Sequence, residues 1–190
     1  MRAIQILDCT LRDGGYCNNW AFGKKIICDT SIKLIEAGIE YIEFGLLSSQ
    51  ASVNEDSTHY SSIIQMDNNR KIINTKINHD VSSKLLCMIN HGDYSISDIP
   101  RNCNLPLGGI RYAFHRKDLY SIYDNILQLK NKGFRIFLQP MQTSRYTKEE
   151  LSYLIRLSNE LKVFSVYIVD SFGSISIYDL LHIVSVFDEL

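Results

Sequence analysis

The sequence predicts a parallel α/β fold, a (β/α)8 TIM barrel of which about six βα units are present. Short β-prone runs alternate with amphipathic helical patterns, which is typical of a parallel sheet covered by helices. A TIM barrel uses about 31 residues for each unit, so 190 residues correspond to about six units. No linker-like stretch interrupts the pattern. We therefore expect one barrel domain over residues 1–190, incomplete at its C-terminus, with a doubly wound sheet as the competing architecture.

Six short runs rich in β-branched and aromatic residues are the expected strands. In the fourth run, Arg111 and His115 share one face, because successive side chains alternate across a strand. The apolar residues Ile110, Tyr112 and Phe114 share the other face and are expected to pack on helices, so the polar face should point into the barrel. The six runs are residues 3–7, 39–45, 84–90, 109–114, 134–139 and 163–170.

The intervals between the strands predict helices. Residues 62–74 follow a polar loop and are expected to be helical. A stripe at i, i+3, i+4 and i+7 predicts a second helix that ends near Gly133, a residue suited to a left-handed cap. This stripe consists of Leu119, Ile122, Tyr123 and Ile126.

Two further helices are expected in the last third of the chain. One begins at Thr147, which is placed to form a capping box with Glu150. The other begins near Ser176 and Asp179, residue types that stabilise a first helical turn. Its apolar residues fall on one face, as in a helix that covers a core. That face consists of Ile177, Leu180, Leu181, Val184 and Phe187.

The composition argues against several classes of protein. The chain is 45% hydrophobic and 22% charged, with a net charge of -1 and no dense basic block. We therefore expect no nucleic-acid partner and no anionic membrane surface. No apolar run approaches the ~18 residues that span a bilayer, and the N-terminus does not resemble a signal peptide. Five scattered cysteines without a CxxC pair predict a reduced, cytoplasmic protein whose thiols lie in the core.

A charged, glycine-rich stretch follows the first predicted strand. Residues 8–16 read DCTLRDGGY, and ligand sites of parallel α/β folds lie beyond the carboxyl ends of the strands. Asp8 and Asp13 offer oxygen ligands to a hard divalent metal. Arg12 offers a fixed positive charge where an enolate would form. The same residue types also form ordinary turns, and composition alone weighs the two interpretations equally.

The stretch LDCTLRDGGY resembles the D-x-T-L-R-D-G signature of the DRE-TIM metallolyases, the HMG-CoA-lyase-like superfamily. Among its members it is closest to the 4-hydroxy-2-oxovalerate aldolase-like proteins. Three later segments are similar to the second, fourth and sixth strands of that family. They are IEFG at 42–45, IRYAFH at 110–115 and VDSFGSI at 169–175. The resemblance spans the whole chain and covers about three quarters of the family's barrel.

The resemblance implies roles for the residues of the first loop. Asp13 corresponds to a ligand of a divalent metal, Mn²⁺, Mg²⁺ or Zn²⁺, and Arg12 to the residue that stabilises the enolate. Tyr16 stands where the oxovalerate aldolases carry a histidine base, so we take it as a candidate catalytic residue. The family's other two metal ligands form an H-x-H pair on the seventh strand, and the 190 residues contain no H-x-H.

Further candidates stand at the ends of the other strands. The resemblance favours a site role for Glu43, either anchoring Arg12 or binding substrate. His115 follows the inward face of its strand and is a candidate base or substrate ligand. For Asp170, capping of the following turn is an equally good interpretation. Expected substrate contacts come from Arg111, Gln139 and Asp170.

The resemblance implies a divalent-metal-dependent carbon–carbon lyase, aldolase-like, that acts on a small oxo acid, with a homo-oligomer possible. A Claisen-type acyltransferase of the isopropylmalate or homocitrate synthase kind is the first alternative. The second alternative is a non-catalytic barrel used for binding or assembly. The 190 residues alone are expected to be inactive and to self-associate, because six of eight barrel strands leave two unpaired edges.

Overall fold

The computed structural model describes residues 4–78 and 80–188. Its centre is a curled parallel sheet in the order β1-β2-β4-β5-β6-β7, and the short β3 pairs with β2 beside this path. Neighbours in the path follow one another along the chain, as they do in a TIM barrel. The predicted fold class is confirmed as a partial barrel. The strands are β1 (Leu7–Asp8), β2 (Tyr41–Leu47), β3 (His59–Tyr60), β4 (Leu85–Asn90), β5 (Gly109–Phe114), β6 (Ile136–Pro140) and β7 (Ser165–Val166).

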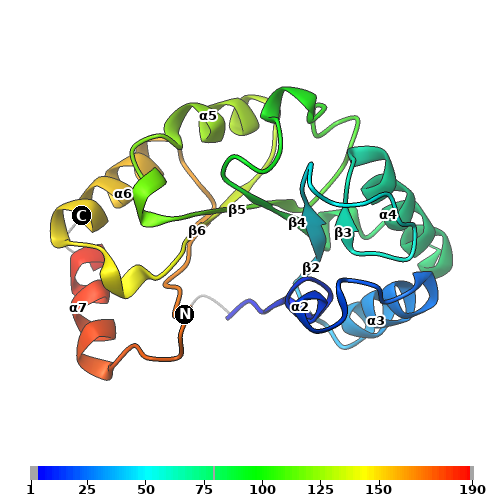
Figure 1. Cartoon of the computed structure of the whole chain (residues 1–190), viewed down its shortest axis with the longest axis horizontal. Helices are drawn as coiled ribbons and strands as arrows, with labels where there is room; N and C mark the ends of the chain where they lie inside the picture. The colour runs from blue at the N-terminus through cyan, green and yellow to red at the C-terminus, as the bar shows by residue number, and fades with distance from the viewer. Residues whose placement is uncertain (1–3, 79, 189–190) are drawn as a thin grey trace.

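The larger helices form an arc on the outer side of the sheet, and the concave side is left to the site loops (Figure 1). The α-helices are α1 (Thr10–Asp13), α2 (Gly15–Asn18), α3 (Lys24–Glu36), α4 (Ile63–Ile77), α5 (Tyr123–Asn131), α6 (Lys148–Glu160) and α7 (Ile177–Asp188). Single 3₁₀ turns are η1 (Ser82–Lys84), η2 (Ile96–Asp98), η3 (Arg116–Asp118) and η4 (Thr143–Arg145).

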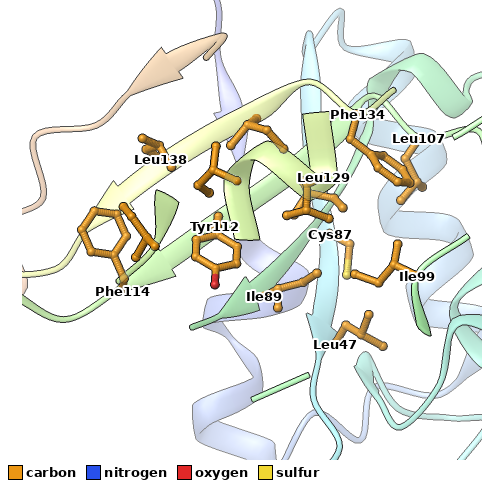
Figure 2. Packing of buried hydrophobic residues seen from close by; sticks show 14 of the residues in the cluster. Leu47, Cys87, Ile89, Ile99, Leu107, Tyr112, Phe114, Leu129, Phe134 and Leu138 are labelled. Atoms are coloured by element: carbon orange, nitrogen blue, oxygen red, sulfur yellow. The ribbon is translucent and has the colours of Figure 1, made fainter. Parts of the chain in front are cut away.

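Most of the core lies between the sheet and this arc of helices. Ile110, Tyr112 and Phe114 of β5 are buried in that layer. Figure 2 shows Ile89 of β4 and Leu129 of α5 on the same side of the sheet. Burial of this apolar surface supplies the main driving force for folding. The prediction that the apolar face of residues 109–114 packs on helices is confirmed.

The concave face of the sheet carries a second, smaller layer of side chains. Tyr41, Leu86 and Phe137 form an apolar floor near the amino ends of their strands. Because inward positions recur every second residue, Glu43 and Arg111 come one step further toward the carboxyl ends. The barrel interior is therefore apolar near the amino ends of the strands and polar near their carboxyl ends. The polar layer opens toward the loops.

The strands at the two edges of the sheet are shorter than predicted. The first predicted strand begins at residue 3, which lies outside the described residues, and pairs only at Leu7–Asp8. The sixth was expected over 163–170 and pairs only at Ser165–Val166. An edge strand has a partner on one side only, so fewer hydrogen bonds hold it in the ladder. The other four predicted strands coincide with β2, β4, β5 and β6 to within two residues at either end.

The ends of the predicted helices are mostly confirmed. α4 contains residues 63–74, and α6 begins with the capping box of Thr147 and Glu150. Gly133, at a φ of 91°, follows α5 as the left-handed cap. The predicted start of α5 is wrong, because Leu119 and Ile122 are buried in the turn that precedes the helix. Their spacing therefore reflects the burial of that turn and does not indicate a helix.

α7 begins where the sequence predicts, with hydrogen bonds in both directions between Ser176 and Asp179. The helix buries Ile183 and Val186, however, and not the predicted stripe. α7 packs against α6 and η4, and within the described residues its other side has no covering element. Among these residues no helix has both the length and the apolar composition needed to cross a membrane. The predicted stripe is exposed at Ile177, Leu180, Leu181 and Val184.

Candidate active site

A pocket of about 1040 Å³ lies on the concave side, where β4, β5 and β6 end and the loop after β1 passes over them. It collects seven of the eight residues proposed from the sequence, and the eighth, Glu43, lies buried beneath the arginine of that loop. The carboxyl ends of parallel strands meet at one end of the fold, so residues far apart in sequence converge there. The seven are Arg12, Asp13, Tyr16, Arg111, His115, Gln139 and Asp170.

The centre of the polar layer is a carboxylate shared by two guanidinium groups. Glu43 is fully buried. Its Oε1 accepts a hydrogen bond of 2.5 Å from Arg12 Nε, and both of its oxygens lie 3.1 Å from Arg111 Nη1. Burial alone lowers the pKa of the Arg12 guanidinium, but the ion pair with Glu43 outweighs burial and raises that pKa above its ordinary value. Arg12 is therefore a permanent, fixed cation.

Arg111 is held from three sides. Besides Glu43, its Nη1 donates to Cys9 Sγ at 3.0 Å, and its guanidinium lies 4.7 Å from the centre of the Tyr167 ring. Burial and the neighbouring Glu43 carboxylate raise the pKa of the Cys9 thiol to about 11, so the thiol stays protonated. Arg111 Nε is buried without a hydrogen-bond acceptor among the described residues. A ligand that offers an acceptor oxygen would satisfy it.

The loop that carries Arg12 is folded by its own backbone. The amide of Arg12 donates to the Cys9 carbonyl at 3.0 Å. The carboxylate of Asp8, one of the two metal ligands considered from the sequence, accepts from the Thr10 amide at 3.0 Å and from its hydroxyl at 3.1 Å. Asp8 therefore caps this turn, while the side chain of Arg12 reaches the buried carboxylate of Glu43.

Trp20 closes over this loop and is not among the residues predicted from the sequence. Its Nε1 donates to the Arg12 carbonyl at 2.8 Å. A Cβ at Gly15 would lie 1.9 Å from the Trp20 indole, so only glycine allows this approach. Trp20 and Asn19 both have positive φ, a conformation that costs free energy in residues other than glycine. Within one sequence, no periodicity or motif signals such a contact.

Asp13 and Tyr16 lie at the exposed rim of the pocket. The Asp13 side chain is 58% exposed and forms an ion pair with Arg12 Nη1. The ring of Tyr16 is also exposed and packs edge-on against Trp20, with the ring centres 4.8 Å apart. The structure thus brings both residues to the pocket without burying either side chain.

The metal implied by the resemblance needs several ligands in one place. In residues 4–78 and 80–188, no three His, Cys, Asp or Glu side chains gather into a group that could hold an ion. Asp13 is accessible as one ligand. The described residues therefore do not make a complete metal site by themselves.

Gln139, His115 and Asp170 complete the pocket wall. Gln139 is buried, and its Oε1 has no donor among the described residues. His115 is exposed at the end of β5. The Asp170 carboxylate accepts backbone hydrogen bonds from Ser174 at 3.0 Å and Ile175 at 2.9 Å, and these bonds lower its pKa. Asp170 therefore caps the following turn and at the same time lines the pocket.

The cysteines differ from the prediction that they lie in the core. Cys28 and Cys87 are buried, but Cys17 and Cys103 are exposed, and Cys9 lies beside Arg111. All five are free thiols. They are scattered over the fold.

Comparisons with known proteins agree with the fold. No family model matches the chain. A curated relative, 4-hydroxy-2-oxovalerate aldolase of Brevibacillus brevis, is 25% identical over 174 residues, which are 92% of this chain and 50% of the relative. A solved structure described as the N-terminal domain of a "putative aldolase" from Bacteroides vulgatus superposes with a TM-score of 0.75 at 25% identity.

The superposition covers 98% of this chain and 60% of the solved one. The chain thus spans about half the length of the curated relative that it matches. The same relationship was inferred from the loop motif at residues 7–16. The chain is a distant homologue of 4-hydroxy-2-oxovalerate aldolase and of this aldolase-like domain, folded as a partial TIM barrel.

Proposed function

We propose that residues 1–190 form one catalytic domain that binds a small 2-oxo acid and contributes to breaking the bond between the α and β carbons of its carbonyl group. The observation that carries this proposal is the buried arrangement of Arg12, Glu43 and Arg111 at the base of the pocket. It holds a guanidinium in place before any ligand arrives. Charge that is fixed in advance stabilises a developing anion without further reorganisation.

Cleavage of the bond between the α and β carbons of a carbonyl compound leaves an electron pair on the α carbon. This pair moves onto the carbonyl oxygen and forms an enolate. Arg12 uses Nε for Glu43 and Nη1 for Asp13, and its Nη2 donates to no described residue. We assign Nη2 to the enolate oxygen. The unpaired Arg111 Nε is suited to the substrate carboxylate, and the unpaired Gln139 Oε1 to a substrate hydroxyl that donates a hydrogen bond.

Cleavage of an aldol also requires a base for the hydroxyl proton. His115 and Tyr16 both line the pocket, and imidazole is the commonest group for proton transfer near neutral pH. We therefore assign this role to His115, and we assign Tyr16 to the rim that orients the ligand. Both side chains are exposed, so either can meet a substrate without a conformational change.

A divalent metal, Mn²⁺, Mg²⁺ or Zn²⁺, with Asp13 as one ligand stays part of the proposal. Because the described residues do not complete its coordination, none of the steps above passes through it. A reduced, cytoplasmic setting is also part of the proposal, supported by the five free thiols.

Oxalate binding tests the proposal directly, because oxalate has the shape and charge of a 2-oxo acid enolate. We expect calorimetric titration of the 190-residue chain to show oxalate binding that Arg12→Lys weakens, whereas Lys33→Gln on the outer face of α3 leaves it unchanged. Mn²⁺ titrations with and without Asp13→Asn test the metal ligand separately. Equal oxalate affinity in the wild type and in Arg12→Lys would rule out the assigned role of Arg12.

Turnover by an active form of the protein separates the lyase from its alternatives. A lyase releases pyruvate from a 4-hydroxy-2-oxo acid, whereas a Claisen-type acyltransferase releases free CoA thiol when an acyl-CoA and a 2-oxo acid are supplied. Release of CoA without pyruvate would replace the lyase by the acyltransferase. If oxalate does not bind and neither pyruvate nor CoA thiol is released, the non-catalytic alternative is left.

A further inference from the structure

We propose that the chain binds a phosphoryl group in a second pocket, and that this group is carried by the end of the substrate remote from the reacting carbons. The proposal rests on the proposed function for the reacting end alone. The second pocket, here called the basic pocket, has a volume of about 650 Å³. Its charged and polar walls include Arg116, Lys117, Tyr120, Arg145 and Glu150.

The basic pocket adjoins the active-site pocket. His115, Lys117 and Met141 line both of them. A ligand that extends from the active-site pocket past these three residues would therefore enter the basic pocket directly. Since His115 is the proposed base, the shared wall is also the place where the reacting end of the substrate lies.

The basic pocket holds two cations without counterions. Arg116 is neutralised by Glu150, because Arg116 Nε lies 2.9 Å and 2.7 Å from the two carboxylate oxygens. Lys117 and Arg145 form no ion pair with any described residue. The pocket thus presents two unmatched positive charges. The active-site pocket is lined by four aspartates, Asp13, Asp93, Asp118 and Asp170, beside the cations Arg12, Arg111 and Lys117.

The Arg145 guanidinium has one neighbouring ring in contact. It lies 5.1 Å from the centre of the Phe172 ring, within the distance of a cation–π contact. It ends the η4 turn, which begins after Gln142 in a left-handed conformation, and the Gln142 amide donates to Ser171 Oγ at 3.1 Å. A guanidinium that is already oriented loses less conformational entropy when it binds an anion.

Two unmatched cations indicate a doubly charged ligand. A phosphate ester carries about -1.5 to -2 charges at pH 7, which matches Lys117 and Arg145 together. A carboxylate carries one charge and would leave one cation unmatched. Arginine binds phosphate through two parallel N–H groups, and lysine binds it as a point charge. Anchoring at a distance from the reacting bond supplies binding energy that can orient the substrate.

Binding measurements on the 190-residue chain test the proposal. The probes are pyruvate, inorganic phosphate and a series of 2-oxo acids that carry a terminal phosphonate on two to four methylene groups. The test variant is the double substitution Lys117→Gln and Arg145→Gln. The matched control is Lys25→Gln with Lys33→Gln, which removes two positive charges from the exposed side of α3. Calorimetry gives affinity, and ³¹P line broadening reports the phosphoryl group.

We expect at least one phosphonate of the series to bind about tenfold or more tightly than pyruvate. The test variant should abolish that gain, measured against pyruvate in the same variant because Lys117 also lines the active-site pocket, and the control variant should keep the gain. Equal affinity for the whole series and pyruvate would overturn the proposal, and so would a gain that survives in the test variant.

One outcome distinguishes a free anion from a phosphoryl group on the substrate. A second outcome distinguishes failure of the proposed function from failure of the anion site. If inorganic phosphate binds and the test variant abolishes its binding, but no phosphonate gains over pyruvate, the pocket holds a free anion and the assignment to substrate is overturned. If pyruvate fails to bind while phosphate binding depends on Lys117 and Arg145, the proposed function fails and the anion site stands.

Discussion

The indole of Trp20 donates its N–H to the backbone carbonyl of Arg12 and lies directly over Gly15. The contact ties a strained tryptophan to the residue that we assign to the enolate oxygen. It also places the single tryptophan of the chain beside the active-site pocket. The emission of Trp20 therefore reports the geometry of this loop.

We expect Gly15→Ala to displace the indole, because the added methyl group would lie 1.9 Å from the ring. The tryptophan emission should shift to longer wavelength, and oxalate affinity should fall together with it. Asn18→Ala, an exposed position on the same short helix, serves as the control and should change neither. Unaltered emission in Gly15→Ala would show that the ring is not packed on this glycine.

Replacement of Glu43 should destabilise the fold strongly. Glu43→Gln removes the negative charge that Arg12 and Arg111 share, and it leaves two buried guanidinium groups uncompensated. We expect the free energy of unfolding to fall by about 3 kcal/mol, measured by urea denaturation. Glu55→Gln, which disrupts only the exposed pair with Lys24, should have little measurable effect. Equal stability of the two variants would contradict the assigned burial of the pair.

Arg12→Lys should not behave as a conservative change. An ammonium group is a mobile point charge and cannot replace the fixed fork that donates to Glu43 and to the ligand. In an active form of the protein we expect kcat to fall by ~10²-fold or more, with a smaller change in KM. Steady-state kinetics decides between the roles, since an effect confined to KM would assign Arg12 to substrate binding.

The five thiols should react at very different rates. At pH 8, iodoacetamide should modify the exposed Cys17 and Cys103 first. Cys9 should react slowly, because burial and then Glu43 raise the pKa of its thiol to about 11, and Cys28 and Cys87 are buried. Mass spectrometry of the labelled peptides gives the order. Early labelling of Cys9 would show that its thiol is not held beside Arg111.

The same thiol makes stability depend on alkaline pH. The folded protein holds the Cys9 proton more tightly than the unfolded chain does, because the pKa rises from about 9 to about 11 on folding. The corresponding stability is fully present below pH 9 and is lost as the pH rises through about 11. Cys9→Ser, which cannot ionise in this range, should show a flatter stability profile than the wild type.

The sequence predicted those parts of the fold that depend on local patterns. The β5 strand was predicted residue for residue, since its apolar face alternates strictly between Ile110 and Phe114. The capping box at Thr147 was predicted because its two partners lie three residues apart. The convergence of Arg12, Glu43 and Arg111 followed from a general rule, namely that parallel strands end on the same side of the fold.

What the sequence did not predict depends on contacts between distant segments. Trp20 reaches the Arg12 carbonyl, and Thr58 donates to the Leu11 carbonyl at 2.6 Å across 47 residues. The stripe of α7 predicted a buried face, but α7 packs against α6 and η4 and buries Ile183 and Val186 instead. Periodicity shows that a helix has an apolar side and does not show which neighbour will meet it.

We expect the 190-residue chain to self-associate through the exposed apolar side of α7. Tyr178 is 81% exposed and Leu181 is 58% exposed, and the edges of β1 and β7 are unpaired among the described residues. Analytical ultracentrifugation should show association that Leu181→Glu weakens. Ile26→Glu, at an exposed apolar position on α3, should leave it unchanged. A monodisperse monomer at all concentrations would contradict this expectation.

The order of the sheet also bears on how the chain reaches this fold during synthesis. Each strand of the path β1-β2-β4-β5-β6-β7 joins the preceding strand of the path, and only the two-residue β3 is made between β2 and β4. No strand has to be inserted between two that are already paired, so each closure spans only one strand–helix unit and costs little loop entropy. A growing polypeptide can therefore add strands to one advancing edge in the order in which the ribosome releases them.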